Sequence, residues 1–183
     1  MAYGQPTILV FGDSLAAGYG IPRDAAWATL MQKELQTTHP HYKVVNASIS
    51  GETTFGGLNR IDATLKLHQP TIVILELGDN DGLRGAKLSE IEHNLNQLIL
   101  RCRAVHAKVL LLGIQLPPNY GLEFSASFKA IFAKVAQRHH IALVPFMLEG
   151  LSAEQFQADN LHPVAAAQPQ ILRNVLPKLK PML

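Results

Sequence analysis

Two short stretches at opposite ends of the chain carry side chains that together suit nucleophilic chemistry. Near the amino end, Ser14 comes shortly after the apolar run 8–11, and near the carboxyl end Asp159 and His162 stand three residues apart. A histidine can take the proton of a serine hydroxyl, and an acid one turn of chain away can hold the imidazole in the correct tautomer. The two stretches therefore indicate a serine activated by a histidine–aspartate pair.

Both stretches also have structural interpretations. Serine is common where a strand turns into a helix, so Ser14 is equally a candidate cap of the following helix. Asp159 is likewise a candidate N-terminal cap of the last helix, with Pro163 in the first turn of that helix. Capping by Asp159 does not exclude a catalytic role, and the two stretches together favour the nucleophile.

Four sequence blocks follow one another in an order that resembles a known family. They are Gly-Asp-Ser-Leu at 12–15, Asn-Ala-Ser-Ile-Ser-Gly-Glu-Thr at 46–53, Gly-Asp-Asn-Asp at 78–81 and Asp-Asn-Leu-His at 159–162. Together they resemble the SGNH (GDSL) hydrolase family, in particular its bacterial branch of small thioesterases, lysophospholipases and arylesterases. The resemblance covers almost the whole chain and implies a single SGNH-hydrolase domain over residues 1–183. The substrate it implies is a small-molecule acyl or aryl ester or thioester, cleaved through an acyl-enzyme without a cofactor.

The resemblance also assigns roles to individual residues. It makes Ser14 the nucleophile and His162 with Asp159 its partners, and it builds the oxyanion hole from the backbone N–H groups of Ser14 and Gly51 and the side-chain amide of Asn80. Glycine lets the main chain approach a substrate closely, and a carboxamide offers an N–H group without a charge. Without the resemblance, Gly51 is equally a turn glycine and Asn80 an Asx-turn residue.

One residue departs from the family pattern. The branch commonly has a second glycine where this chain has Asp79. A carboxylate beside the oxyanion donor opposes the developing negative charge if it points inward, whereas in water its charge is screened. We expect Asp79 to face solvent or to be hydrogen bonded.

Apolar residues in the loops after the third and fourth predicted strands are candidates for substrate binding. They are Leu83, Leu116, Pro117 and Tyr120. Such residues can wall an acyl or aryl pocket, and the alternative is that they pack the loops onto the core.

The elements that position these residues follow from apolar periodicity. Five apolar runs, at 7–11, 43–47, 71–76, 108–114 and 141–145, are mostly continuous, as in strands that are covered on both faces. Between and after them, helical spacing covers about 25–37, 58–68, 89–106, 126–140 and 164–179. Alternation of this kind predicts an α/β fold, a three-layer α/β/α sandwich with a five-stranded parallel sheet. The flavodoxin-like strand order 2-1-3-4-5 is implied by the resemblance and by the general rule for such sheets.

Composition narrows the classes of function. A net charge of +2 over 183 residues does not indicate a nucleic-acid surface, and no apolar run is long enough for a membrane span. The histidines other than His162 lack a spaced set of acidic or cysteine partners, so we expect surface histidines and no metal site. We expect a monomer. Relatives in the branch are typically exported, so we expect a periplasmic or secreted protein in mature form, with the cytoplasm still possible.

Two rival functions remain open at this stage. The superfamily that the chain resembles includes carbohydrate O-deacetylases, against which the apolar loops argue mildly. A flavodoxin-like module could instead bind a phosphate at the glycines after the first strand. That loop lacks the Walker lysine and the G-x-G-x-x-G spacing, and a phosphate-binding module has no use for Asp159 and His162.

Overall fold

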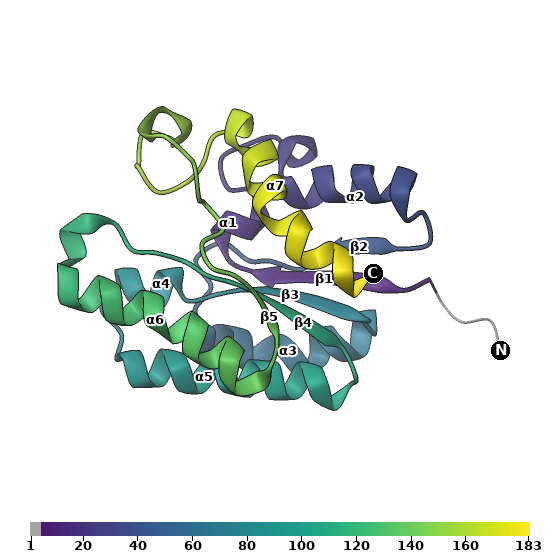
Figure 1. Cartoon of the computed structure of the whole chain (residues 1–183), viewed down its shortest axis with the longest axis horizontal. Coiled ribbons are helices and arrows are strands. Elements are labelled where there is room, and N and C mark those ends of the chain that lie inside the picture. The colour runs from purple at the N-terminus through teal and green to yellow at the C-terminus, as the bar shows by residue number, and fades with distance from the viewer. Residues whose placement is uncertain (1–4) are drawn as a thin grey trace.

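A five-stranded parallel sheet forms the centre of the computed structural model, which describes residues 5–183 (Figure 1). The strands are β1 (Thr7–Gly12), β2 (Lys43–Asn46), β3 (Ile72–Glu76), β4 (Lys108–Leu112) and β5 (Ala142–Val144). They lie in the order β2-β1-β3-β4-β5, and every neighbouring pair is parallel. The predicted fold class and strand order are confirmed.

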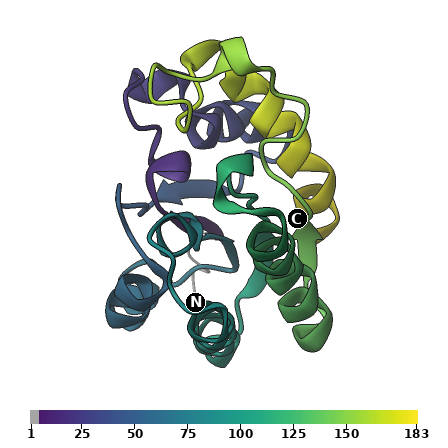
Figure 2. The ribbon, with the colours of Figure 1, turned by 90° about the vertical axis from the view of Figure 1, so that its left-hand side faces the viewer.

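Helices cover both faces of the sheet, as the two views show (Figures 1 and 2). One face carries α2 (Trp27–Thr38) and α7 (Gln168–Leu179), and the other carries α3 (Thr54–His68), α5 (Leu88–Ala104) and α6 (Leu122–His139). Two short helices, α1 (Ser14–Ala17) and α4 (Asp79–Leu83), begin at the ends of strands. Short 3-10 helices lie at Arg23–Ala25, Pro118–Tyr120, Ala153–Gln155, Ala165–Ala167 and Lys180–Met182.

The central strands explain why the apolar runs are continuous. All residues of β1 and β3 are buried, because side chains on both sides of these strands enter one of two apolar cores. The edge strands β2 and β5 are only partly buried. Burial on both faces therefore removes the alternation that a half-exposed strand would show.

The sheet brings the sequence blocks to one edge, which we call the carboxyl edge because the parallel strands end there. Ser14 follows β1 and Asn80 follows β3, and these strands are neighbours although β2 lies between them in the sequence. Ligands in open α/β sheets bind at such a switch point, where successive connections leave on opposite faces. The segment before α7 reaches the same edge because α7 packs beside α2, where the Gln168 side-chain oxygen accepts a hydrogen bond from the Trp27 backbone N–H at 3.0 Å.

The last helix starts later than predicted. It was expected from about residue 164, whereas α7 begins at Gln168 after the 3-10 turn Ala165–Ala167. Pro169 lies in the first turn of α7, where a proline costs no helical hydrogen bond. None of the helices within residues 5–183 has the length and apolar character needed to cross a bilayer.

Candidate active site

Three side chains from the two ends of the chain form a continuous hydrogen-bonded chain at the carboxyl edge. Ser14 Oγ lies 2.8 Å from His162 Nε2, and His162 Nδ1 lies 2.7 Å from Asp159 Oδ2. Ser14 is buried, whereas Asp159 is exposed. The structure therefore brings together the three residues that the sequence singled out, across 148 positions of sequence.

The capping role considered for Ser14 belongs to its neighbour. The Asp13 Oδ1 atom accepts a hydrogen bond from the Leu15 backbone N–H at 3.0 Å and so caps α1. Ser14 is the first residue of α1, and its hydroxyl faces His162. Because Asp13 satisfies the helix end, the serine oxygen is available for chemistry.

Asp159 is not the cap of the last helix. Its Oδ1 atom accepts hydrogen bonds from the backbone N–H groups of Leu161 at 2.9 Å and His162 at 3.0 Å, within a turn that Asn160 enters with a φ of 57°. Although partial burial opposes the change, the hydrogen bonds from His162 and Leu161 lower the pKa of Asp159 to about 2. The aspartate is therefore an anion over the whole neutral range.

Gln157 ties the histidine segment to the loop after α1. Its side-chain amide donates to the Tyr19 carbonyl at 2.8 Å, and its backbone N–H donates to the His162 carbonyl at 2.8 Å. A Cβ on Gly20 would clash with the Gln157 side-chain amide, so glycine makes room for this contact. The Tyr19 ring packs on the His162 ring with centroids 4.5 Å apart. Nothing in the sequence spacing pointed to Gln157 or Tyr19.

The candidate oxyanion donors come from the loops after β2 and β3. The Asn80 Nδ2 group donates to Glu52 O at 3.0 Å and to Asp13 Oδ2 at 3.2 Å, so it connects the loop after β2 with the loop after β1. Gly51 has a φ of 81° and open space where a Cβ would stand. Its positive φ requires glycine, as the turn interpretation also assumed.

Two further contacts hold these loops in place. Asp81 accepts hydrogen bonds from the backbone N–H of Thr54 at 2.8 Å and from its hydroxyl at 2.6 Å, which fixes the start of α3 against α4. Arg60 pairs with Glu52 at 2.6 Å and stacks over the Phe11 ring. The loops that carry Gly51 and Asn80 are therefore positioned by a network of polar contacts from several elements.

Comparisons with known proteins agree with this arrangement. Residues 10–168 match the GDSL-like Lipase/Acylhydrolase family. The chain belongs to this family. It is 49% identical to "Esterase TesA" of Pseudomonas aeruginosa over 97% of this chain and 89% of that protein. It is 42% identical to "Thioesterase 1/protease 1/lysophospholipase L1" of Escherichia coli over 100% of this chain and 87% of that protein.

A solved structure extends the agreement to the backbone. The crystal structure of TesA superposes with a TM-score of 0.94 at 49% identity and covers 97% of this chain and 99% of that one. The predicted membership of the bacterial thioesterase, lysophospholipase and arylesterase branch, and ester hydrolysis as the class of reaction, are confirmed by these relatives.

A pair of buried carboxyl groups lies beneath the GDSL serine. Glu76 and Asp13 are both fully buried, and the Asp13 backbone N–H donates to Glu76 Oε2 at 3.2 Å. Burial and the nearby Asp79 raise the pKa of Asp13 to about 7. Burial and the nearby Asp13 raise the pKa of Glu76 well above its usual range. The Asp13 carboxyl group itself accepts hydrogen bonds from the Leu15 backbone N–H at 3.0 Å and from Asn80 Nδ2 at 3.2 Å.

The expectation for Asp79 is wrong. Asp79 is 9% exposed. Its side chain makes no hydrogen bond to the rest of residues 5–183 that would stabilise the charged form. The reason is the turn at Gly78, whose φ of 127° starts α4 directly over the end of β3. Asp79 is therefore largely shielded from solvent, close enough to Asp13, Glu76 and His162 for their charges to interact. Burial, opposed by the attraction of His162, raises the pKa of Asp79 to about 6.

The apolar loop residues divide into two groups. Leu116 is 7% exposed and packs against Gly82, which favours the packing role for this residue. Leu83, Pro117 and Tyr120 are half-buried, and the Tyr120 hydroxyl donates to the Leu83 carbonyl at 3.2 Å. That contact links the loops after β3 and β4, and a substrate-binding role for these three residues stays a prediction.

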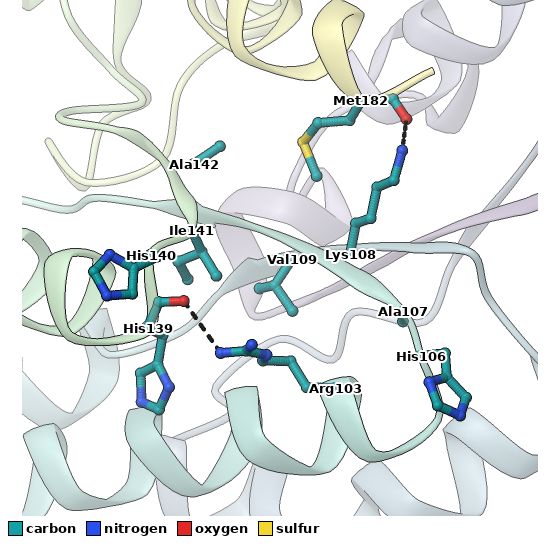
Figure 3. Close-up of a pocket in the computed structure, with 10 residues that line it drawn as sticks. All are labelled: Arg103, His106, Ala107, Lys108, Val109, His139, His140, Ile141, Ala142 and Met182. Carbon is teal, nitrogen blue, oxygen red and sulfur yellow. Dashed lines mark hydrogen bonds between the residues drawn. The ribbon is translucent and has the colours of Figure 1, made fainter.

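The opposite edge of the sheet, where the strands begin, carries a cavity of about 530 Å³ with several basic residues (Figure 3). We call it the amino-edge cavity; its lining includes Arg103, His106, Lys108, His139 and His140.

His139, which was expected on the surface, is only 8% exposed, and its Nε2 atom bonds Asn96 Oδ1 at 2.8 Å between α6 and α5. Within residues 5–183, histidine, cysteine, aspartate and glutamate form no group of three or more that could hold a metal ion.

Proposed function

We propose that this chain is a serine hydrolase that cleaves carboxylic esters and thioesters of acyl or aryl substrates through an acyl-enzyme on Ser14. The observation that carries the proposal is the unbroken hydrogen-bonded chain from Asp159 through His162 to Ser14. Asp159 is held as an anion, the form in which it can orient His162 and stabilise the imidazolium that forms.

In the first half of the reaction, Ser14 Oγ attacks the carbonyl carbon while its proton moves to His162 Nε2. The tetrahedral intermediate carries a negative oxygen, which the backbone N–H groups of Ser14 and Gly51 and the Asn80 amide stabilise. As the intermediate collapses, the bond to the leaving alcohol or thiol breaks and His162 returns the proton to the leaving group. Water then attacks the acyl-enzyme by the same route and releases the acid.

Asn80 must share its donors for this to happen. Its Nδ2 group already bonds Glu52 O and Asp13 Oδ2. A primary amide has two N–H groups, so one of these bonds is shared with the oxyanion or given up to it, while the other keeps the amide in its fixed orientation. This arrangement is the preorganisation that makes oxyanion donors effective.

The finer parts of the proposal rest on the family. The names of the relatives point to thioesters and lysophospholipids as well as simple esters. For the acyl group we propose contacts with Leu83, Pro117 and Tyr120, which are half-buried in the loops after β3 and β4. We also propose that residues 1–183 act as one hydrolase domain, as a monomer, in the periplasm or outside the cell, by resemblance to the exported bacterial branch.

The test compares the parent chain with Ser14→Ala on p-nitrophenyl esters of two to twelve carbons and on matching acyl thioesters. We expect hydrolysis by the parent and a loss of at least about 10³-fold in Ser14→Ala. A fluorophosphonate should label Ser14 in the parent alone. Activity restricted to acetyl esters would favour the O-deacetylase alternative, and full activity in Ser14→Ala would refute the proposed mechanism.

A further inference from the structure

Asp79 is a carboxylate inside the site that the reaction described above does not use. It is next to Asn80 in the sequence, at the start of α4, and nine-tenths of it is buried. His162 lies close enough to influence its charge. The next residue, Asn80, bonds Asp13 beside Ser14, so Asp79 stands at the border of the space where the reacting ester must bind.

Asp79 also lacks a partner. No hydrogen bond from residues 5–183 stabilises its charged form, whereas Asp13, Asp81 and Asp159 each accept two or more. Burying a carboxylate without a donor is costly, and the cost falls when a ligand supplies the donor. The unpaired carboxylate therefore selects for a ligand group that carries an N–H or O–H.

The charges around Asp79 narrow the chemistry further. The titratable groups that face it are His162 from the segment before α7, Asp13 from the end of β1 and Glu76 from the end of β3. In its charged form, the Asp79 carboxylate repels an anionic substrate group. His162 returns the proton to the leaving group, so a side chain near His162 is within reach of the alcohol part of the ester.

We propose that Asp79 is a specificity-determining residue of this site: it accepts a hydrogen bond from a hydroxyl or ammonium group on the alcohol part of the ester. This proposal rests on the proposed function, because it assumes that the ester binds between Ser14, Asn80 and His162. The preference should be strongest above about pH 6, where burial no longer keeps Asp79 protonated. Below that pH the carboxyl group is neutral and the preference weakens.

Two pairs of butyrate esters of equal shape test the proposal. One pair is 2-hydroxyethyl and propyl butyrate, and the other is 2-(dimethylammonio)ethyl and 3-methylbutyl butyrate. The quantity measured is the ratio of kcat/KM within each pair at pH 5 and pH 7.5, in which the shared pH dependence of Ser14 and His162 cancels. We expect the parent at pH 7.5 to favour the donor ester by roughly tenfold or more, the effect of a hydrogen bond to a charged group.

The variants separate specificity from folding. Asp79→Ala should bring both ratios close to one, whereas Asp79→Asn, which keeps an acceptor without charge, should lose the ammonium preference and keep part of the hydroxyl preference. Asp62→Asn removes an exposed carboxylate from α3 and should leave both ratios unchanged. A ratio near one in the parent, or a ratio that survives in Asp79→Ala, overturns the proposal. Hydrolysis of propyl butyrate by the parent shows in the same experiment that the hydrolase function itself holds.

Discussion

The two edges of the sheet both gather titratable side chains, but only one of them arranges these side chains to act together. At the carboxyl edge, Asp159, His162 and Ser14 are joined by side-chain hydrogen bonds of 2.7 and 2.8 Å. At the amino edge, basic side chains line a cavity of about 530 Å³. Titratable side chains are therefore present at both edges, and the difference lies in what each polar group bonds to.

Two basic groups at the amino edge are bonded to the fold itself. Arg103 donates to the His139 carbonyl at 3.2 Å, and Lys108 donates to the Met182 carbonyl at 2.8 Å (Figure 3). The two side chains extend to opposite sides of the strand in that view. His140 has a φ of 50° and caps the end of α6 with its backbone N–H, which donates to the carbonyls of Ala136 and Gln137. These contacts satisfy helix ends and loops.

Replacing one histidine at each edge gives the largest contrast. His162→Ala should lower kcat/KM for an ester by at least about 10⁴-fold, because both the base and the link to Asp159 are lost. His140→Asn, a change that keeps a residue tolerant of positive φ, should leave kcat/KM within about twofold. Initial rates on p-nitrophenyl butyrate with both purified variants measure the difference. A comparable loss in His140→Asn would mean that the amino edge takes part in catalysis.

A pair of asparagines sharpens the comparison at a smaller effect. Asn80→Ala should reduce kcat by about 10²–10³-fold through loss of one oxyanion donor. Asn96→Ala removes the partner of the buried His139 and should lower the free energy of unfolding by about 1 kcal/mol while kcat stays unchanged. Kinetics and thermal unfolding of the two variants separate the effects. An Asn80→Ala protein whose lost activity is explained by unfolding would contradict the assigned role.

The residues that sequence reasoning found and those that it missed differ in a physical way. Ser14 and His162 were found because their residue types suit nucleophilic chemistry and because the four blocks resemble a known family, and the parallel sheet explains why these distant blocks meet at one edge. Gln157 was missed because its contacts join two loops whose path depends on tertiary packing. The prediction for Asp79 was wrong because its burial depends on the turn at Gly78, whose positive φ the sequence does not specify.

The same argument applies to the buried acids and the helix boundary. Asp13 was recognisable as part of the GDSL block, but its partner Glu76 reads in the sequence only as the polar end of an apolar strand. The order of the strands followed from the family resemblance, whereas the start of α7 depended on whether residues 165–167 adopt 3-10 or α geometry. Such short-range choices cost little free energy and leave little trace in the sequence.

The stability contributed by each edge should also depend on pH, in opposite directions. Asp79 at the carboxyl edge gives the larger effect. Its pKa is raised from 3.8 to about 6, so the folded protein binds this proton more tightly than the unfolded chain does. That contribution to stability is complete below about pH 4 and is lost as the pH rises through 6. From pH 4 to pH 8 the parent should therefore lose stability that Asp79→Asn keeps. The free energy of unfolding of the variant should rise relative to that of the parent by up to about 3 kcal/mol over this range. Urea titrations at these two pH values measure the gain, and equal pH dependence in both proteins would disprove the buried charge.

His139 at the amino edge gives the smaller and opposite effect. Burial, with Arg103 and Arg138 nearby, lowers the pKa of His139 below 6.5, so the unfolded chain binds this proton more tightly than the folded protein does. Its contribution to stability is present above pH 6.5 and is lost as the pH falls through the lowered pKa. His139→Gln keeps a hydrogen-bonding side chain between α6 and α5 but does not titrate. In urea titrations from pH 8 to pH 5 the variant should therefore lose less stability than the parent. Its kcat should be unchanged, because His139 takes up a proton at the amino edge, far from the reacting groups.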